Sequence, residues 1–321
     1  MRWGVLSTAR IARSILRGAR AADGVEVVAV ASRDEERARA FAADHGIPRA
    51  HGSYEALLAD PEVDAVYNPL PNALHVPWSV QALQAGKHVL CEKPLSRRPE
   101  DVEAAFVAAQ RAGRLLMEAF MWRFHPQTEE LAGLVARGVA GELRTVRAAF
   151  GFPLDDAGDV RLSRALEGGA LMDVGCYCVS GLRLLCGEPV RVSAEQVVGG
   201  DGVDVRLAAT LRFAGDVLGV FDCGMDVPRR SSLEVVGSEA TLIVGDPWVR
   251  PSAIVVRRAG AEPERVDVPS ADPYARELEE FSAAARAGEA PRLGRADALG
   301  QARAIAALYD AAEAGQAVTV G

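Results

Sequence analysis

The sequence is poor in cysteine, and its five cysteines give no sign of a metal or disulfide framework. Cys91, Cys176, Cys178, Cys186 and Cys223 form no CxxC pair and no Cys/His cluster of zinc-site spacing. An odd number of cysteines is also a poor basis for a set of disulfides. We therefore expect buried thiols and no bound metal.

The chain also lacks an excess of positive charge and a long apolar run. It has 36 Lys and Arg against 44 Asp and Glu, a formal charge of -8, which opposes attraction to nucleic-acid phosphates or anionic bilayers. No uncharged apolar run reaches membrane-spanning length. Residues 2–20 contain five arginines and no acid, as a transit peptide does, but residues 2–6 read as a strand that feeds a helix. We expect a cytoplasmic protein that binds neither nucleic acid nor membrane.

The length of 321 residues, with 49% hydrophobic residues, predicts two domains with substantial cores. In residues 1–120, apolar runs alternate with helical segments. The predicted strands are 2–6, 25–31, 63–67, 88–91 and 115–118, and the predicted helices are 10–21, a helix from 34, 73–85 and 99–112. Strands buried on both faces and separated by helices are typical of a parallel sheet. We predict a doubly wound, Rossmann-type nucleotide-binding domain over residues 1–120.

The pattern changes after residue 120, and the fold class is therefore α/β with two different sheets. Short Gly and Asp turns join predicted strands at 143–150, 191–198, 205–213, 217–223, 232–236 and 240–244. This spacing predicts a large, open, mostly antiparallel sheet in a second α/β domain over residues 121–321. Helices at 125–137, 170–186, 274–287 and 296–314 could cover one face of that sheet, which leaves the other for a partner subunit.

The first strand is not followed by the glycine fingerprint of a dinucleotide site. Ser7-Thr8-Ala9-Arg10-Ile11-Ala12 stands where GxGxxG would stand. These small residues preserve the close approach of backbone to pyrophosphate, but they do not share the freedom of glycine at positive φ. As a motif the turn is weak, and its position after the first strand is what favours a cofactor loop.

The end of the second strand lacks the carboxylate that usually binds the adenosine ribose of NAD. Ala31-Ser32-Arg33 stands there, and Arg37 follows one helical turn later. A hydroxyl and an arginine fork suit a 2′-phosphate, which predicts NADP rather than NAD. The alternative is a solvated arginine at the start of an amphipathic helix.

Two motifs far apart in the chain suggest acid/base chemistry. Cys91-Glu92-Lys93-Pro94 places a lysine at the end of a strand, and Asp173 precedes Tyr177 by four residues on one face of a predicted helix. A cation beside a phenol favours the phenolate, so the tyrosine could exchange a proton with a carbinol or carbonyl oxygen. A surface lysine and a core tyrosine are the alternatives.

Several motifs together resemble the glucose-fructose oxidoreductase family, also called the Gfo/Idh/MocA family. They are residues 4–12 and 31–34, Asn68-Pro-Leu-Pro-Asn72-Ala-Leu-His75, Glu92-Lys93-Pro94, Glu118-Ala-Phe-Met-Trp-Arg123-Phe-His-Pro-Gln127 and Gly168-Gly-Ala-Leu-Met-Asp173-Val-Gly-Cys-Tyr177. The resemblance covers essentially the whole chain. Within the family it looks closest to the branch of dimeric dihydrodiol dehydrogenase and NADP-dependent D-xylose 1-dehydrogenase.

The resemblance implies an active site between a Rossmann domain and a C-terminal domain whose open sheet forms a homodimer or homotetramer. Lys93 and Tyr177 become the catalytic pair, and Asp173 becomes a substrate-site residue. The implied cofactor-binding residues are Ser7, Thr8, Ala9, Arg10, Ile11, Ser32, Arg33, Leu70, Asn72, His75, Glu92, Lys93 and Arg123, with Arg37 added by the phosphate argument above. The Lys93–Pro94 peptide could be cis. Trp122, Phe150 and Phe152 would supply an apolar wall, with core packing as the alternative.

The resulting prediction is an NADP(H)-dependent oxidoreductase that acts on a secondary alcohol or hemiacetal of a sugar-like or cyclic diol substrate. A biosynthetic ketosugar reductase is the alternative among enzymes. A cofactor-binding regulator or scaffold without turnover is the alternative of a different class, and the retention of both Lys93 and Tyr177 argues against it.

Overall fold

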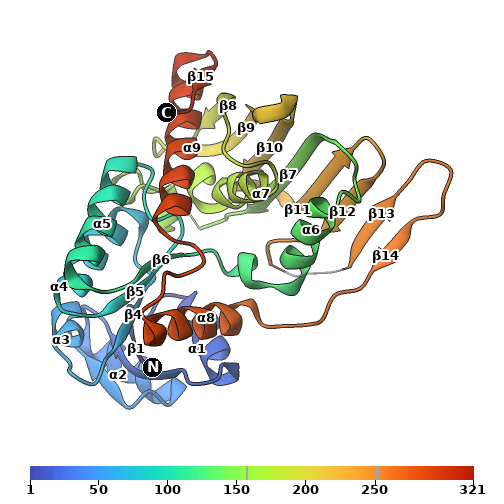
Figure 1. The fold of residues 1–321 in the computed structure, drawn as a ribbon. Coiled ribbons are helices and arrows are strands. Elements are labelled where there is room, and N and C mark those ends of the chain that lie inside the picture. The colour runs from blue at the N-terminus through green and yellow to red at the C-terminus, as the bar shows by residue number, and fades with distance from the viewer. Residues whose placement is uncertain (157, 250–252) are drawn as a thin grey trace. The chain divides into compact units, whose positions relative to one another are not determined.

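A computed structural model describes residues 1–156, 158–249 and 253–321 (Figure 1). The chain forms two compact units, Met1–Met121 with Asp272–Leu299, and Trp122–Ala271 with Gly300–Gly321. The division predicted from the sequence placed Asp272–Leu299 in the second domain, whereas the structure packs this segment with the first unit.

The first unit contains a six-stranded parallel sheet in the order β3-β2-β1-β4-β5-β6, which confirms the predicted doubly wound fold. The strands are β1 (Arg2–Leu6), β2 (Glu26–Ala31), β3 (Arg49–His51), β4 (Ala65–Asn68), β5 (His88–Glu92) and β6 (Leu116–Ala119). The helices are α1 (Ala12–Ala21), α2 (Glu35–His45), α3 (Tyr54–Leu58), α4 (His75–Gln84), α5 (Pro99–Ala112) and α8 (Pro273–Ala287). Strand β3 and helix α3, which are three and five residues long, were not predicted from the sequence.

Helix α8 joins the first unit through close contact with α1 and β1. A Cβ on Gly18 of α1 would lie 2.7 Å from Cβ of Tyr274 and 2.9 Å from the backbone N of Ala275, so glycine is required for the two helices to touch. The ring of Phe281 in α8 lies 5.4 Å from that of Trp3 in β1, and both side chains are buried. These tertiary contacts explain why a helix distant in the sequence belongs with the parallel sheet.

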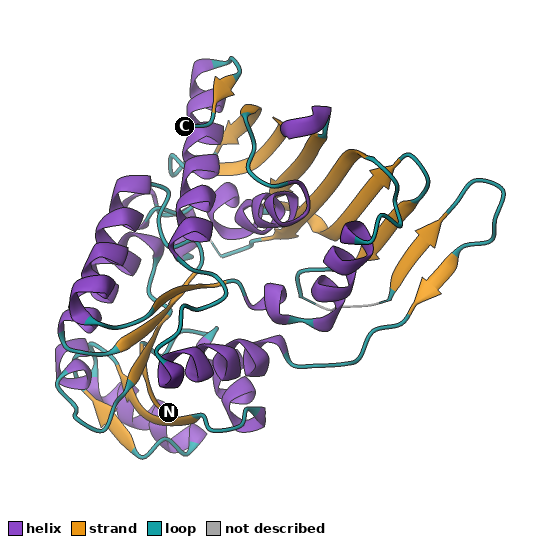
Figure 2. Ribbon diagram, viewed as in Figure 1, coloured by secondary structure: helices purple, strands orange, loops and turns teal. Residues whose placement is uncertain are grey.

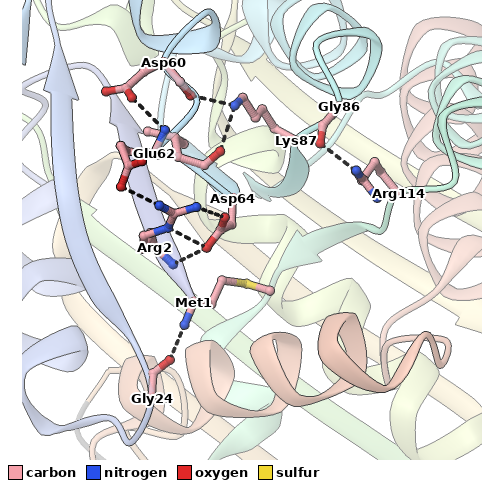
Figure 3. Close-up of polar contacts among 10 residues, drawn as sticks. Met1, Arg2, Gly24, Asp60, Glu62, Asp64, Gly86, Lys87 and Arg114 are labelled. Atoms are coloured by element: carbon pink, nitrogen blue, oxygen red, sulfur yellow. Dashed lines mark hydrogen bonds and ion pairs between the residues drawn. The ribbon is translucent and has the colours of Figure 1, made fainter.

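Charged side chains order the amino-terminal ends of the parallel strands (Figure 3). Arg2 at the start of β1 donates from Nη2 to Oδ1 of Asp64 at 2.7 Å and from Nε to Oδ2 at 3.1 Å. Nζ of Lys87 donates to the carbonyl oxygens of Asp60 and Val63, both at 2.7 Å. Because ligands of parallel sheets bind at the carboxyl ends of the strands, these contacts serve stability.

The second unit contains a nine-stranded sheet in the order β14-β13-β12-β11-β7-β10-β9-β8-β15 (Figure 2). All neighbouring strands are antiparallel except β7 and β10, which confirms the predicted mostly antiparallel sheet. The strands are β7 (Leu143–Pro153), β8 (Arg191–Val198), β9 (Asp204–Arg212), β10 (Leu218–Gly224), β11 (Asp226–Gly237), β12 (Thr241–Gly245), β13 (Ile254–Arg257), β14 (Glu264–Val266) and β15 (Val318–Thr319). Strands β13, β14 and β15 were not predicted from the sequence.

Helices cover one face of this sheet (Figure 2), and no helix of the described residues covers the other. The helices are α6 (Pro126–Ala136), a π-helical turn at Leu171–Gly175 that runs into α7 (Cys176–Cys186), and α9 (Arg295–Ala314), most of which belongs to this unit. Along β9, Leu207, Ala209 and Leu211 are buried, while the residues between them are exposed. The open face has a shallow concavity of about 890 Å³, lined in part by Ser193, Glu195, Thr210, Val220 and Glu234.

One described stretch, Arg164–Cys186, is long and apolar enough to cross a membrane by length and composition alone, with a mean hydropathy of 1.3. In its most apolar window, 78% of the residues are buried inside the protein, as they are in a core helix of a soluble protein.

The five cysteines, all of which the structure describes, form no disulfide, and four of them are buried.

Glu277 in α8 is a buried acid whose stability contribution depends on pH. Its side chain is 0% exposed, and neither carboxylate oxygen has a hydrogen-bond partner among the described residues. Burial raises the pKa of Glu277 well above its ordinary value, and the negative charges of Glu92 and Glu280 raise it further. The folded state therefore keeps a proton that the unfolded state loses as pH rises above the ordinary glutamate pKa, and the free energy of unfolding falls with pH.

We predict that Glu277→Gln, which mimics the neutral acid and cannot ionise, stabilises the protein relative to wild type increasingly as pH rises. The difference should grow by up to ~1.4 kcal/mol per pH unit between the unfolded and folded pKa values. Thermal unfolding at pH 5 and pH 8 measures it. Glu289→Gln, at an exposed position of the same unit, is the matched control and should show no such trend. A difference in melting temperature that is equal at both pH values would contradict a raised pKa.

Candidate active site

The parallel register of the first unit brings four of the predicted loops to one edge of the sheet. Leu6 pairs with Ala31, Val5 with Tyr67, and Asn68 with Cys91, so β1, β2, β4 and β5 end side by side. Ser7–Ile11, Ser32–Arg33, Leu70–Asn72 and Glu92–Lys93 follow these ends. Strand β1 lies between β2 and β4, where the strand order reverses, which is where open α/β sheets bind ligands.

Ser7 takes the place of the first fingerprint glycine and adopts the backbone conformation of a glycine. Its φ is 119°, a value that residues with a Cβ rarely adopt. Its N–H donates to the carbonyl oxygens of Ala31 at 3.0 Å and Val5 at 3.2 Å, and its Oγ accepts from the N–H of Ala9 at 3.1 Å. The hydroxyl thus stabilises the tight turn for which the sequence lacks a glycine. Thr8, Ala9 and Ile11 are half-buried in this turn, and Arg10 is exposed.

The segment after β2 uses its nearest carboxylate as a helix cap. Asp34 accepts the N–H of Arg37 at 3.1 Å and is the N-cap of α2. Ser32 is 8% exposed and its Oγ accepts the N–H of Asp34 at 3.2 Å, while Arg33 and Arg37 are exposed. The acid that follows this strand is therefore engaged in a cap, and Arg33 and Arg37 are exposed together with the acids between them.

His75 ties together two of the loops at this edge. The side chain is 1% exposed, with Nδ1 2.8 Å from the carbonyl oxygen of Pro94 and Nε2 2.6 Å from that of Leu70. Burial lowers the pKa of His75 to about 4, and the two carbonyl oxygens oppose this lowering. A neutral ring can donate to only one of the two carbonyl oxygens at a time. Asn68 adds a second tie, because its Nδ2 donates to the carbonyl oxygen of His75 at 3.0 Å. Asn72 is half-buried, and its contact with a cofactor, like that of His75, stays a prediction.

Glu92 and Lys93 lie at the end of β5 beside a phenol that the sequence analysis did not single out. The hydroxyl of Tyr67 donates to Oε1 of Glu92 at 2.5 Å, and the N–H of Lys93 lies 3.3 Å from Oε2. Burial raises the pKa of Tyr67, and the charge of Glu92 raises it further, so the phenol remains a donor. Lys93 is half-buried, and the Lys93–Pro94 peptide is cis, as the resemblance implied.

In the second unit, Asp173 lies in the π-helical turn and Tyr177 in the first turn of α7, and both are half-buried. Oδ2 of Asp173 accepts from Nε of Arg161 at 2.8 Å, and Nη1 of Arg161 lies 3.1 Å from Oδ1 of Asp159. The charge of Asp173 is the main cause of a raised pKa at Arg161. Sequence reasoning missed Arg161, which no motif marks.

Tyr177 lies in an aromatic cluster. Its ring is 5.4 Å from that of Phe150 at an interplanar angle of 77°, and 6.2 Å from that of Trp248. Trp122 meets Trp248 edge-on at 4.9 Å. Phe150 and Trp122, which were predicted to form an apolar wall, thus belong to one cluster with Tyr177, and Trp248 was missed. Phe152 is half-buried near the end of β7.

Arg123 and His125 contact their own unit. Arg123 is 8% exposed, with Nη1 3.3 Å from Oγ of Ser180 in α7 and its guanidinium 5.8 Å from the ring centre of Trp122. Nδ1 of His125 accepts the N–H of Gln127 at 3.0 Å, so this histidine caps α6. Among the described residues, no group of three or more His, Cys, Asp and Glu side chains is placed to hold a metal ion.

A Rossmann sheet with a tight first turn is typical of a dinucleotide-binding domain, and here it is joined in one chain to a broad mixed sheet. A family model described as "Oxidoreductase family, NAD-binding Rossmann fold" matches residues 1–120. A second model, the "GFO/IDH/MocA C-terminal domain", matches residues 128–243. The chain belongs to the Gfo/Idh/MocA family of oxidoreductases, which confirms the resemblance.

Three relatives illustrate the range of the family near this chain. D-xylose 1-dehydrogenase (NADP(+)) 2 of Haloferax volcanii is 42% identical, over 99% of each chain. A trans-1,2-dihydrobenzene-1,2-diol dehydrogenase of Danio rerio is 37% identical over 80% of this chain and 78% of its own. A solved structure of KijD10, a 3-ketoreductase from Actinomadura kijaniata in complex with NADP and TDP-benzene, is 35% identical with a TM-score of 0.92, over 97% of each chain.

Proposed function

We propose that the protein transfers hydride between NADP(H) and a secondary alcohol or hemiacetal of a sugar-like or cyclic diol substrate. The observation that carries this proposal is the pair of acid/base motifs, Glu92-Lys93-Pro94 at a strand end of the first unit and Asp173–Tyr177 at a helix start of the second. Relatives named for NADP, D-xylose and a dihydrodiol support the cofactor and the substrate class. A ketosugar reductase is the second candidate, favoured by the likeness to the 3-ketoreductase.

The residues at the carboxyl edge of the first sheet fit a dinucleotide with a 2′-phosphate. The turn at Ser7 is held in a conformation suited to glycine, which lets the backbone approach a pyrophosphate. Asp34 is engaged as a helix cap, and Arg33 and Arg37 are exposed beside it. A bound NADP would supply the carbon that accepts or donates hydride.

The side chains supply proton transfer and orientation. In oxidation, the Tyr177 phenolate accepts the proton of the substrate hydroxyl, and in reduction the phenol donates it. The Lys93 ammonium stabilises the phenolate by Coulomb attraction. Asp173 orients a substrate hydroxyl, and Arg161 holds its carboxylate at 2.8 Å. Structures of the A. kijaniata 3-ketoreductase include variants with one lysine or one tyrosine replaced, and these two residues are as far apart in its chain as Lys93 and Tyr177 are here.

A non-catalytic regulator is the weaker reading, because a protein that only binds a cofactor needs no acid/base pair.

The open face of the second sheet fits a homodimer or homotetramer, since it exposes Leu218 and Val220 beside the concavity. Light scattering of the full chain should give the mass of two or four subunits. A monomer at micromolar concentration would contradict this assembly.

We predict that Tyr177→Phe lowers kcat by about 10²- to 10⁴-fold, the usual contribution of a general acid or base. NADP binding should stay within twofold, because the variant removes only a hydroxyl. Turnover is measured with a panel of aldoses, cyclic diols and ketosugars. Tyr54→Phe is the matched control, since Tyr54 is buried against Trp78 in the first unit. Undiminished turnover in Tyr177→Phe would contradict the proposed acid/base. NADP binding without turnover by the intact protein on the whole panel would favour the regulator.

We predict that Arg33→Ala raises the Kd of NADP+ about tenfold or more and changes the Kd of NAD+ less than twofold, because a charge-assisted contact to the 2′-phosphate is lost. Fluorescence titration of both nucleotides measures the two constants. Arg39→Ala is the control, because Arg39 is an exposed arginine of α2 that pairs with Glu35. Equal weakening of both nucleotides would show that Arg33 does not read the 2′-phosphate.

A further inference from the structure

Asp204, the first residue of β9, is a buried carboxylate that accepts hydrogen bonds from two other elements. The side chain is 3% exposed. Its Oδ2 accepts the N–H of Leu171 at 2.7 Å, and its Oδ1 accepts the hydroxyl of Tyr309 in α9 at 2.8 Å. The N–H of Ala170 also stabilises the carboxylate. The carboxylate thus holds the first residues of the helical segment that carries Asp173 and Tyr177.

The backbone on the other side of Asp204 is fitted to it. Gly169 has a φ of 126°, and a Cβ at this position would lie 2.1 Å from Oδ1 of Asp204 and 3.0 Å from the hydroxyl of Tyr309. The carbonyl oxygen of Gly169 accepts the N–H of Asp173 at 2.9 Å. Only glycine allows this packing at position 169, so the carboxylate of Asp204 explains Gly169, whereas a Cβ on Gly168 would lie 2.1 Å from the carbonyl oxygen of Arg161.

The arrangement is costly for stability. Burying a carboxylate is unfavourable unless hydrogen bonds or a cation compensate it, and here the leading compensation comes from N–H and O–H groups. Two titratable groups that interact with Asp204 are Tyr309 from α9 and the thiol of Cys223 from β10, and neither is a cation. Such a costly acceptor at the start of a helix indicates a requirement for placing that helix.

We propose that Asp204 and Tyr309 are positioning residues, which fix the start of the π-helical turn and thereby the placement of Asp173 and Tyr177. The proposal rests on the catalytic role of Tyr177 put forward above. Leu171 lies six residues before Tyr177, a span of up to about 9 Å at the α-helical rise. A tilt of a few degrees at Leu171 moves the phenol by a substantial fraction of an ångström, and a misplacement of about 1 Å can cost about 10²-fold in rate.

The pKa of Asp204 gives the proposal a signature that a purely structural role would lack. Burial raises this pKa to about 6, against the hydrogen bonds from Leu171 and Tyr309 that lower it. A raised folded pKa means that this group costs stability as pH rises from the ordinary aspartate value to about 6, so acidification from pH 7 to pH 5 removes part of that cost, and further acidification toward the ordinary value removes the rest. The same acidification should lower the activity, because the protonated acid is a weaker acceptor for the N–H groups at the start of the helix.

The test compares Asp204→Asn, Tyr309→Phe and the double variant with wild type, all as the full chain. Asp267→Asn is the control, since the side chain of Asp267 is 78% exposed.

Hydrogen exchange of the amides of residues 170–177 needs no substrate and should accelerate about tenfold in Asp204→Asn and several-fold in Tyr309→Phe. Turnover is measured with NADP+ and D-xylose, or with the panel substrate that is turned over fastest. We expect kcat to fall about 10- to 100-fold in Asp204→Asn and about 3- to 10-fold in Tyr309→Phe. The double variant should match Asp204→Asn, because both residues act through one carboxylate. The acid limb of kcat near pH 6 should vanish in Asp204→Asn.

Unchanged exchange in both single variants would overturn the proposal, as would a kcat within twofold of wild type despite faster exchange. Tyr309→Phe deletes one hydroxyl and carries the test if Asp204→Asn does not fold. Tyr177→Phe is measured in parallel. If that variant is inactive while Asp204→Asn and Tyr309→Phe turn over normally, only the positioning role fails. If Tyr177→Phe keeps full turnover, the proposed function of Tyr177 fails instead, whatever the exchange rates show.

Discussion

The pairing of β1 with β2 on one side and β4 on the other is the constraint on which the nucleotide-binding unit depends. Parallel hydrogen bonding fixes Leu6 beside Ala31 and Val5 beside Tyr67, so segments some twenty-five to sixty residues apart end at one edge. The same register sends Arg2 and Asp64 to the opposite edge, where they form a surface ion pair (Figure 3). One edge of the sheet is thereby left for chemistry, and charges that serve only stability gather at the other.

Much of the fold could be predicted from the sequence, because the elements concerned carry strong local patterns. Val28–Ala31 and Val89–Cys91 are continuous buried runs, and such runs between helices are typical of parallel strands. The missed strands β3, β14 and β15 have two or three residues, none of them buried, so they leave no periodicity to detect. The assignment of α8 to the first unit could not be predicted, since it depends on contacts of Gly18 with Tyr274 and of Trp3 with Phe281, which connect opposite ends of the chain.

The candidate site likewise contains some residues that could be predicted from the sequence and others that could not. Ser7, Lys93 and Tyr177 could be singled out because each stands at a strand end or in a short motif with a known chemical use. Arg161 and Trp248 lie outside any motif, and only the fold brings them to Asp173 and Tyr177. Ser7 also has a φ that usually requires glycine, and three hydrogen bonds of the serine hold this conformation. Sequence patterns thus single out the groups that we propose to react better than the groups that hold them.

Two buried acids show how the same desolvation leads to opposite charge states. Burial raises the pKa of both Glu277 and Asp204. Neither oxygen of Glu277 has a hydrogen-bond partner among the described residues, and the nearby charge of Glu92 opposes a second negative charge, so Glu277 stays neutral. Asp204 accepts from Leu171 and Tyr309, which limits its pKa to about 6 and leaves it ionised at neutral pH. A neutral carboxyl is a weaker hydrogen-bond acceptor, whereas an ionised one attracts N–H groups strongly enough to fix the start of a helix. The number of donors around each carboxyl therefore decides which acid is able to organise the structure near it.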